Sequence, residues 1–297
     1  MIFRNMKMEF MKILSGYGFY LCVLFTGLLC FSAYIYEDVM DGNKYSVLRS
    51  FLSFDRKFML EDTTFCSFEV IWNSAGNWLF LFVPIIAAFT FVPLVCDEHE
   101  SGAVRFEVVR SNKFCYDTSR FFSGCLCGGL AVMTGFIIFV VIVHLLFPFI
   151  GSYSEELQKD YRAVLAAMDI NISGKFYVAE IVMKIGEMFL YGAFWAAPAM
   201  LLTGVIHNKY LILCLPFFLK YTINQTEIRM TSQVLENPEK VHPLFTQINM
   251  IVYPDALAEL SGDRKYMMQV LFYSFSVMFL SYIVYLFLQK RRVDRGE

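Results

Sequence analysis

The chain has 297 residues, of which 57% are hydrophobic and only 18% are charged, and its mean hydropathy is +0.52. A soluble domain carries about 25% charged residues, so much of this surface must face something other than water. The net charge of −2 provides no basic surface of the kind that binds nucleic acid, and nucleic-acid partners are therefore excluded from the prediction.

Apolar runs recur six times along the chain. A transmembrane helix needs about 20 predominantly apolar residues to cross the hydrocarbon core. The predicted spans are residues 16–36, 78–96, 121–147, 178–206, 210–223 and 267–288, and the fifth is the shortest. The expected fold is an all-α polytopic membrane protein, with residues 1–297 forming a single transmembrane domain in contact with the lipid bilayer.

The segments between these runs carry helix patterns of their own. Apolar residues at helical spacing in residues 45–54 predict a short amphipathic helix. Ser154, Glu155 and Glu156 suit a helix start, so a helix is expected over residues 157–168. Prolines break the segment before the last span, in which residues 244–258 are apolar enough to enter the bilayer.

Lysine and arginine residues predict the orientation of the bundle. Six spans place both termini and residues 97–120 on one side, where basic residues are denser than on the other. Lys290, Arg291 and Arg292 form the clearest basic cluster. Because basic residues are retained on the cytoplasmic side, both termini are expected in the cytoplasm.

Charged residues inside predicted spans are costly and have specific surroundings. Glu180, Lys184 and Glu187 share one face of the fourth span, and both glutamates are expected to pair with the lysine. This polar stripe either lines a translocation path or gate, or contacts water at the outer interface; its position near the outer end favours the second interpretation. Lys220 is expected to extend to the outer interface.

Glycines and prolines in the spans predict how the helices pack. Gly124 and Gly128 match the G-x-x-x-G pattern of close helix contacts. Prolines within the predicted spans are expected to bend them, namely Pro84, Pro93, Pro198 and Pro216. The result would be a mobile bundle of bent helices.

The segment between the second and third spans carries the most informative pattern. It opens with an acidic cluster, after which Gly102 permits a tight turn. An amphipathic piece then runs to Arg110, with Val104 and Val108 on its apolar side, and Ser111 and Asn112 form a turn. We expect a short helix parallel to the membrane, which either docks into a soluble partner or serves as an interfacial linker.

One part of this segment follows a pattern found in a transporter family. The pattern consists of Glu98 and Glu100, then Ser101-Gly102, then a turn with Ser111, and then Arg120 at the next span. It resembles the intracellular loop of ABC-2 type permeases, and the six-span layout is similar over nearly the whole chain. The chain departs from the family at Asn112-Lys113, where a proline is usual.

The resemblance implies a membrane subunit of an ATP-binding cassette transporter, acting as an exporter in the plasma membrane. Its partners would be a separate ATPase and a second permease, either another copy or a paralogue. ATP and Mg²⁺ would bind to the ATPase, so no cofactor is expected on this chain, which has no G-x-x-x-x-G-K-[ST] motif. The implied coupling residues are Asp97, Glu98, Glu100, Gly102, Arg105 and Arg110.

Other classes of function remain as alternatives. A membrane-embedded enzyme is disfavoured because no H-E-x-x-H or G-x-S-x-G motif occurs in a span. No metal site is predicted, since Cys125 and Cys127 lack the usual zinc spacing. A self-sufficient secondary carrier would call for inverted repeats and polar groups near the midplane, which the sequence does not reveal. A membrane sensor or assembly subunit is the last alternative.

Overall fold

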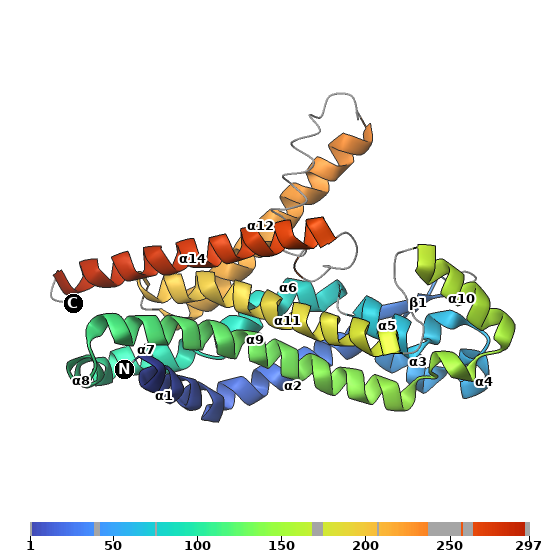
Figure 1. Cartoon of the computed structure of the whole chain (residues 1–297), viewed down its shortest axis with the longest axis horizontal. Coiled ribbons are helices and arrows are strands. Elements are labelled where there is room, and N and C mark those ends of the chain that lie inside the picture. The colour runs from blue at the N-terminus through green and yellow to red at the C-terminus, as the bar shows by residue number, and fades with distance from the viewer. Residues whose placement is uncertain are drawn as a thin grey trace.

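The computed structural model describes residues 2–38, 42–74, 76–167, 175–206, 208–236, 257 and 264–294, which form an elongated helical bundle (Figure 1). The elements in chain order are α1 (Ile2–Ser15), α2 (Tyr17–Ser32), β1 (Tyr34–Glu37), β2 (Lys44–Ser46), α3 (Val47–Ser53), α4 (Arg56–Met59), η1 (Thr63–Phe65), α5 (Ser67–Ser74), α6 (Asn77–Phe89), α7 (Val92–Glu100), α8 (Ala103–Arg110), α9 (Lys113–Leu146), η2 (Ile150–Ser152), α10 (Glu155–Ala167), α11 (Lys175–Thr203), α12 (Lys209–Glu236) and α14 (Arg264–Asp294).

Four segments of the described chain have the length and hydropathy of a membrane span. They are Trp78–Glu100, Lys113–Ser152, Val178–Thr203 and Met267–Lys290, and they coincide with the second, third, fourth and sixth predicted spans. A fifth is obtained if α1 and α2 count as one span, although these helices meet at 61°. The structure agrees with an all-α membrane protein, with four or five spans among the described residues where six are predicted.

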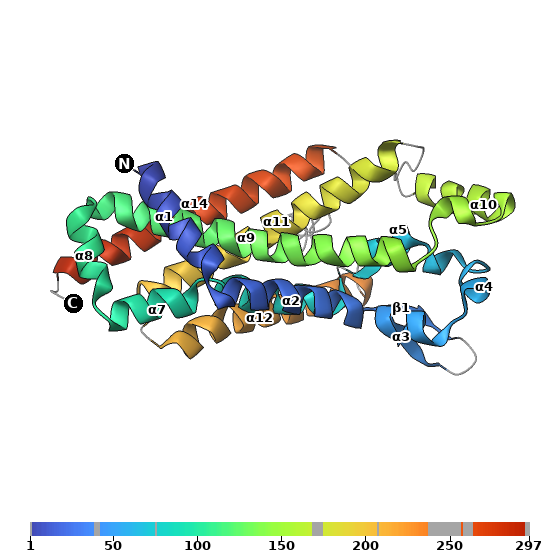
Figure 2. The same cartoon turned by 90° about the horizontal axis from the view of Figure 1, so that it is seen from below.

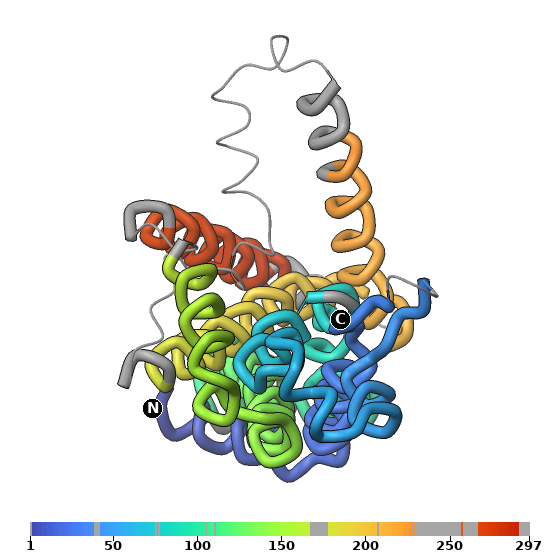
Figure 3. Tube along the Cα trace, turned by 90° about the vertical axis from the view of Figure 1, so that its right-hand side faces the viewer, coloured from blue at the N-terminus to red at the C-terminus, as the bar shows by residue number. Residues whose placement is uncertain are grey.

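The first and fifth predicted spans differ from expectation for separate reasons. α2 has only 16 residues, fewer than the 20 or so that a perpendicular span needs. α12 continues as a helix to Glu236, well beyond the predicted end at residue 223, and its later turns leave the bundle (Figure 3). Most of the segment expected to break and enter the bilayer before the last span, residues 237–256 and 258–263, lies outside the described residues.

The long axis of the bundle has two distinct ends. Figure 1 shows the start of α1, the corner containing α8 and the last turns of α14 at one end, which we call the α8 end. The other end carries β1, α3, α4, α5 and α10, and we call it the hairpin end (Figures 1 and 2). The two termini therefore approach the same end of the bundle.

The hairpin end is built on aromatic contacts. An antiparallel pairing of β1 and β2, absent from the all-α prediction, places Tyr36 beside Tyr45. The Tyr36 ring packs against Phe54 and Phe65, with ring centroids 5.5 and 5.1 Å away. The two helices predicted between the spans are present as α3 and α10. These contacts hold the connecting segments together beyond the ends of the long helices.

Helix α9 lies at the centre of the bundle and packs against α1, α2, α6 and α11. A Cβ atom on Gly192 of α11 would lie 3.0 Å from the carbonyl oxygen of Gly128 and 3.1 Å from Cα of Gly129. A Cβ atom on Gly128 would lie 2.9 Å from that of Ala196. The backbones of α9 and α11 are therefore in direct contact, and the close-contact interpretation of the G-x-x-x-G pattern is confirmed at Gly128.

The break between α6 and α7 shows how proline acts in a span. α6 ends at Phe89 and α7 begins at Val92, with Pro93 in its first turn. A proline is tolerated at that place because the first-turn N–H groups have no partner in the helix. Pro84, Pro198 and Pro216 lie inside α6, α11 and α12.

We predict that Gly192→Ala destabilises the bundle by about 1–3 kcal/mol, because the new methyl group meets α9 backbone atoms that cannot move aside. The measurement is thermal unfolding in detergent, followed with a thiol-reactive dye that reports exposure of the buried cysteines. Gly186→Ala on the same helix is the control, since its Cβ atom would have no neighbour within 4 Å. This control should gain up to about 1 kcal/mol of helix propensity. Equal melting temperatures for the two variants would contradict the prediction.

Candidate functional site

Two tight turns fold the chain around α8. Gly102 adopts a φ of +71°, a left-handed conformation that residues with a side chain rarely adopt. Asn112 then caps α9, and its side-chain oxygen accepts a hydrogen bond from the backbone N–H of Phe114 at 3.2 Å. The predicted short helix between the second and third spans is therefore present, with a defined turn on each side.

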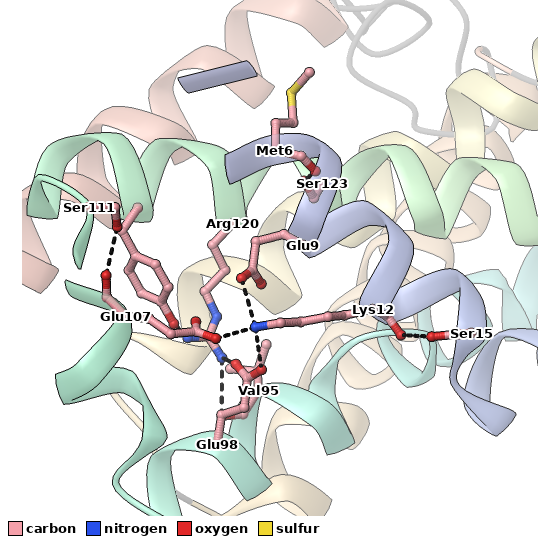
Figure 4. Close-up of polar contacts among 11 residues, drawn as sticks. Met6, Glu9, Lys12, Ser15, Val95, Glu98, Glu107, Ser111, Arg120 and Ser123 are labelled. Atoms are coloured by element: carbon pink, nitrogen blue, oxygen red, sulfur yellow. Dashed lines mark hydrogen bonds and ion pairs between the residues drawn. The ribbon is translucent and has the colours of Figure 1, made fainter. Parts of the chain in front are cut away.

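Five charged residues from four helices meet beside this corner (Figure 4). We call Glu9, Lys12, Glu98, Glu107 and Arg120 the corner cluster. The Nζ atom of Lys12 lies 3.2 Å from the Glu9 carboxylate and 3.3 Å from that of Glu98, and it also contacts Glu107. Lys12 thus joins α1 to both α7 and α8.

Arg120 is the most deeply buried member of the corner cluster, with 3% of its side chain exposed. Its guanidinium lies 2.8 Å from the Glu98 carboxylate and donates to the carbonyl oxygen of Val95 at 3.3 Å. It also donates to the hydroxyl of Tyr116, one turn earlier on α9. A buried charge is tolerated only with such partners, so Arg120 fixes the end of α7 against the start of α9.

The charges of the corner cluster do not balance. Three carboxylates face two cations, which leaves one negative charge in excess when all are ionised. Burial raises the pKa of Glu9, and the neighbouring Arg120 and Lys12 act in the opposite direction. The Lys12 ammonium lies between the three carboxylates, and no group of His, Cys, Asp or Glu among the described residues is arranged to hold a metal ion. The corner cluster therefore acts as a structural contact that connects four helices.

The predicted coupling residues whose side chains the structure describes do not form one surface. Glu98 points into the corner cluster, where its side chain is only 13% exposed. Asp97 pairs with Lys209 at the start of α12, at 3.6 Å, and Glu100 is exposed. Arg105 and Arg110 belong to α8, but their side chains lie outside the described part of the structure.

The described side chains on the outer side of α8 are apolar. Val104 and Val108 are half-buried, as the predicted amphipathic pattern requires. Phe106 and Val109, by contrast, are 82% and 90% exposed at the extreme end of the bundle. These two side chains, one turn apart on α8, are available for contact with an apolar neighbour.

The polar stripe on α11 is partly buried. Lys184 is 2% exposed and Glu187 is 4% exposed, so the interpretation that water solvates the stripe is wrong for these two residues. Their charged groups lie 3.6 Å apart, and the Lys184 ammonium sits 4.6 Å from the ring centre of Trp72 on α5. Glu180 is half-buried and makes no ion pair with a described residue. Its expected pairing with Lys184 is absent.

Lys220 on α12 also contradicts the sequence-based expectation. Its side chain has no solvent-exposed surface, so it does not extend to the outer interface. The bundle therefore contains charged groups at Lys184, Glu187 and Lys220 that are enclosed by protein. Such groups usually mark functional or path-lining positions in membrane proteins.

Sequence reasoning missed most members of the corner cluster. Glu9 and Lys12 lie before the first predicted span and were assigned no role, although their i, i+3 spacing could have indicated one helix face. The contacts of Lys12 with Glu98 and Glu107 join residues far apart in the chain, and no pattern in one sequence reveals such pairs.

Comparison with known proteins adds no family assignment. No family model matches the chain, and no curated protein sequence matches it at a significant level. The functional hypotheses therefore rest on the corner, the outer face of α8 and the buried charges of α11 and α12.

We predict that Arg120→Met destabilises the protein by about 3–5 kcal/mol, because it leaves the Glu98 carboxylate poorly compensated in a buried position. Asp97→Asn is the matched control: its pair with Lys209 is exposed, and exposed pairs contribute about 1 kcal/mol or less. Thermal unfolding in detergent measures both effects. A small loss for Arg120→Met, equal to that of Asp97→Asn, would show that Arg120 does not hold the corner.

The pair on α11 gives a second test by double substitution. Lys184→Met alone should destabilise the bundle by about 3–5 kcal/mol, because Glu187 remains charged and buried. The double variant Lys184→Met/Glu187→Met should recover most of that loss, since neither charge remains. Losses that simply add in the double variant would mean that the two side chains are not coupled.

Proposed function

We propose that the chain is the membrane subunit of an ATP-binding cassette transporter of the ABC-2 permease type, driven by a separate ATPase. In this proposal six helices cross the plasma membrane, both termini are cytoplasmic, and the subunit pairs with a second copy or a paralogue. The expected direction is export, and the transported substrate is left open. The α8 end is then the cytoplasmic end of the bundle.

The observation that carries the proposal is the outer face of α8. Phe106 and Val109 project from the tip of the bundle, on a short helix bounded by the Gly102 turn and the Asn112 cap. A partner with an apolar groove would bury both side chains at little conformational cost, because the helix is already formed. Glu100, which is exposed, would lie at the rim of such a contact.

The corner cluster supplies the mechanical link that coupling requires. A docked ATPase that moves α8 would pull on Glu107, which contacts Lys12, and through Lys12 on α1 and on Glu98. Glu98 is in turn held by Arg120 of α9. Motion of α8 is thereby passed to α1, α7 and α9 together. Of the residues that transmit it, Glu98 and Arg120 are the best shielded from water and salt, with side chains 13% and 3% exposed.

The energy source lies outside the chain in this proposal. The sequence has no phosphate-binding motif of the G-x-x-x-x-G-K-[ST] type. ATP and Mg²⁺ are therefore assigned to the ATPase partner, and this subunit is assigned no catalytic residue. In this proposal the subunit contributes the docking helix α8, the corner cluster that connects α8 to the other helices, and the helical bundle that changes conformation.

A second candidate, a self-sufficient secondary carrier, is favoured by a different observation. Lys184 and Glu187 lie in the interior of α11, which has the length and hydropathy of a span, and Lys220 is fully buried in α12. Charged groups at membrane depth are the polar elements that a carrier needs. The two candidates differ in whether an ATPase binds to the α8 end.

We predict that an ATPase with a Walker motif co-purifies with the tagged chain from its native host in mild detergent, and that Phe106→Ser/Val109→Ser abolishes its recovery. Two central apolar contacts of this kind contribute about 2 kcal/mol or more each when they are hot spots. Leu48→Ser/Leu52→Ser is the matched control, because it removes two exposed apolar side chains from the short helix α3 at the hairpin end. The control should retain the ATPase.

Two outcomes would contradict the proposal. If the chain elutes alone under conditions that keep a known transporter complex intact, the carrier becomes the better candidate. If the ATPase is retained by Phe106→Ser/Val109→Ser as well as by the control, the docking surface lies elsewhere than α8.

A further inference from the structure

Helix α1 turns two polar residues toward the bundle together with the apolar Ile13. Asn5 and Glu9 are 4% and 5% exposed and face the bundle, whereas Phe3 and Met11 are 81% and 56% exposed on the opposite side. A helix whose outer side faced only water would carry polar residues there, without exposed side chains such as Phe3 and Met11. Phe3 and Met11 on the outer side of α1 therefore suit a neighbour that has apolar groups.

Two basic residues share this outer side. Arg4 and Lys7 are exposed between Phe3 and Met8, and neither forms an ion pair with any residue in the part of the chain that the structure describes. Apolar side chains interleaved with unpaired cations form the pattern by which a helix inserts its apolar groups into a membrane surface and attracts anionic headgroups.

The angle of α1 agrees with a position at the membrane surface. α1 meets α2 at 61°, and Figure 2 shows α2 running along the bundle while α1 crosses α9. Where α2 follows the direction of the spans, α1 lies closer to the membrane plane than to its normal. Tyr17 and Tyr20, just after the bend, are 89% and 62% exposed, and exposed tyrosines are typical of the headgroup level.

We infer that the outer face of α1, formed by Phe3, Arg4, Lys7, Met8 and Met11, is a binding surface for anionic lipid headgroups. The apolar side chains enter the boundary between headgroups and acyl chains, and Arg4 and Lys7 pair with the phosphates. Each basic residue near an anionic surface raises the affinity about fivefold. The surface continues directly into the exposed apolar side of α2, with Leu21, Leu24 and Leu28, which the bilayer covers.

The opposite face of the same helix contributes Glu9 and Lys12 to the corner cluster. A lipid that holds α1 in place therefore also favours the arrangement of α7 and α8 that Lys12 stabilises. Lipid composition and the geometry of the corner are linked through one helix.

The test uses the full-length chain in nanodiscs of phosphatidylcholine alone or with added phosphatidylglycerol, and measures hydrogen–deuterium exchange of the α1 amides. Phosphatidylglycerol should slow exchange in α1. In Arg4→Gln/Lys7→Gln the affinity of α1 for the anionic surface should fall about 25-fold, so most or all of this extra protection should be lost. Arg56→Gln/Lys57→Gln is the matched control, because it removes one exposed arginine and one exposed lysine from α4 at the hairpin end. The control should behave like the unmodified chain.

The inference is overturned if phosphatidylglycerol does not slow exchange in α1, or if Arg4→Gln/Lys7→Gln keeps the full protection. It is also overturned if the protection follows the number of chains per disc and not the lipid, because a second copy would then cover this face. The experiment contains no ATPase, so its result is independent of the proposed transport function.

Discussion

The buried guanidinium of Arg120 determines how the helices are arranged at the α8 end of the bundle. Arg120 lies almost wholly inside the protein, where an isolated charge would be very costly, so Glu98, the Val95 carbonyl and Tyr116 must all stay within reach of it. That requirement fixes where α7 ends relative to α9. Lys12 then brings α1 and α8 to the same carboxylates. The tight turn at Gly102 and the helix cap at Asn112 let the backbone bring α7, α8 and α9 to positions where these contacts form.

A different constraint governs the rest of the bundle. In lipid, the hydrophobic effect provides little driving force for helices to associate. Apolar side chains gain little by leaving lipid for protein, so close backbone packing supplies much of the attraction. The glycines of α9 and α11 provide that packing, whereas the exposed apolar side chains of α14 need no protein partner in a bilayer. Close helix packing does not require charged residues, so it does not account for the buried charges of Lys184, Glu187 and Lys220.

Local sequence patterns predicted the local structure well, but they did not predict contacts between residues far apart in the chain. Gly102, Ser111-Asn112 and the amphipathic run to Arg110 predicted α8 and its turns, since turn and cap chemistry act within a few residues. Apolar runs located four spans correctly. The pairs formed by Lys12 with Glu98 and by Lys184 with Trp72 depend on tertiary packing, and the expected solvation of Lys184 and Lys220 failed for the same reason. The β1–β2 hairpin is too short and irregular to produce an alternating pattern.

The two exposed apolar faces at the α8 end differ in what surrounds them, and this decides what each can bind. Phe106 and Val109 sit on α8 at the tip of the bundle, between two candidate spans and outside both, and the proposed function assigns them a protein partner. Phe3 and Met11 lie on a helix inclined to the spans, beside the exposed side of α2 and next to two cations, where lipid is the natural neighbour. The corner cluster lies between these faces and contacts both helices. A force applied to α8 and a lipid bound to α1 would therefore act on the same five charges.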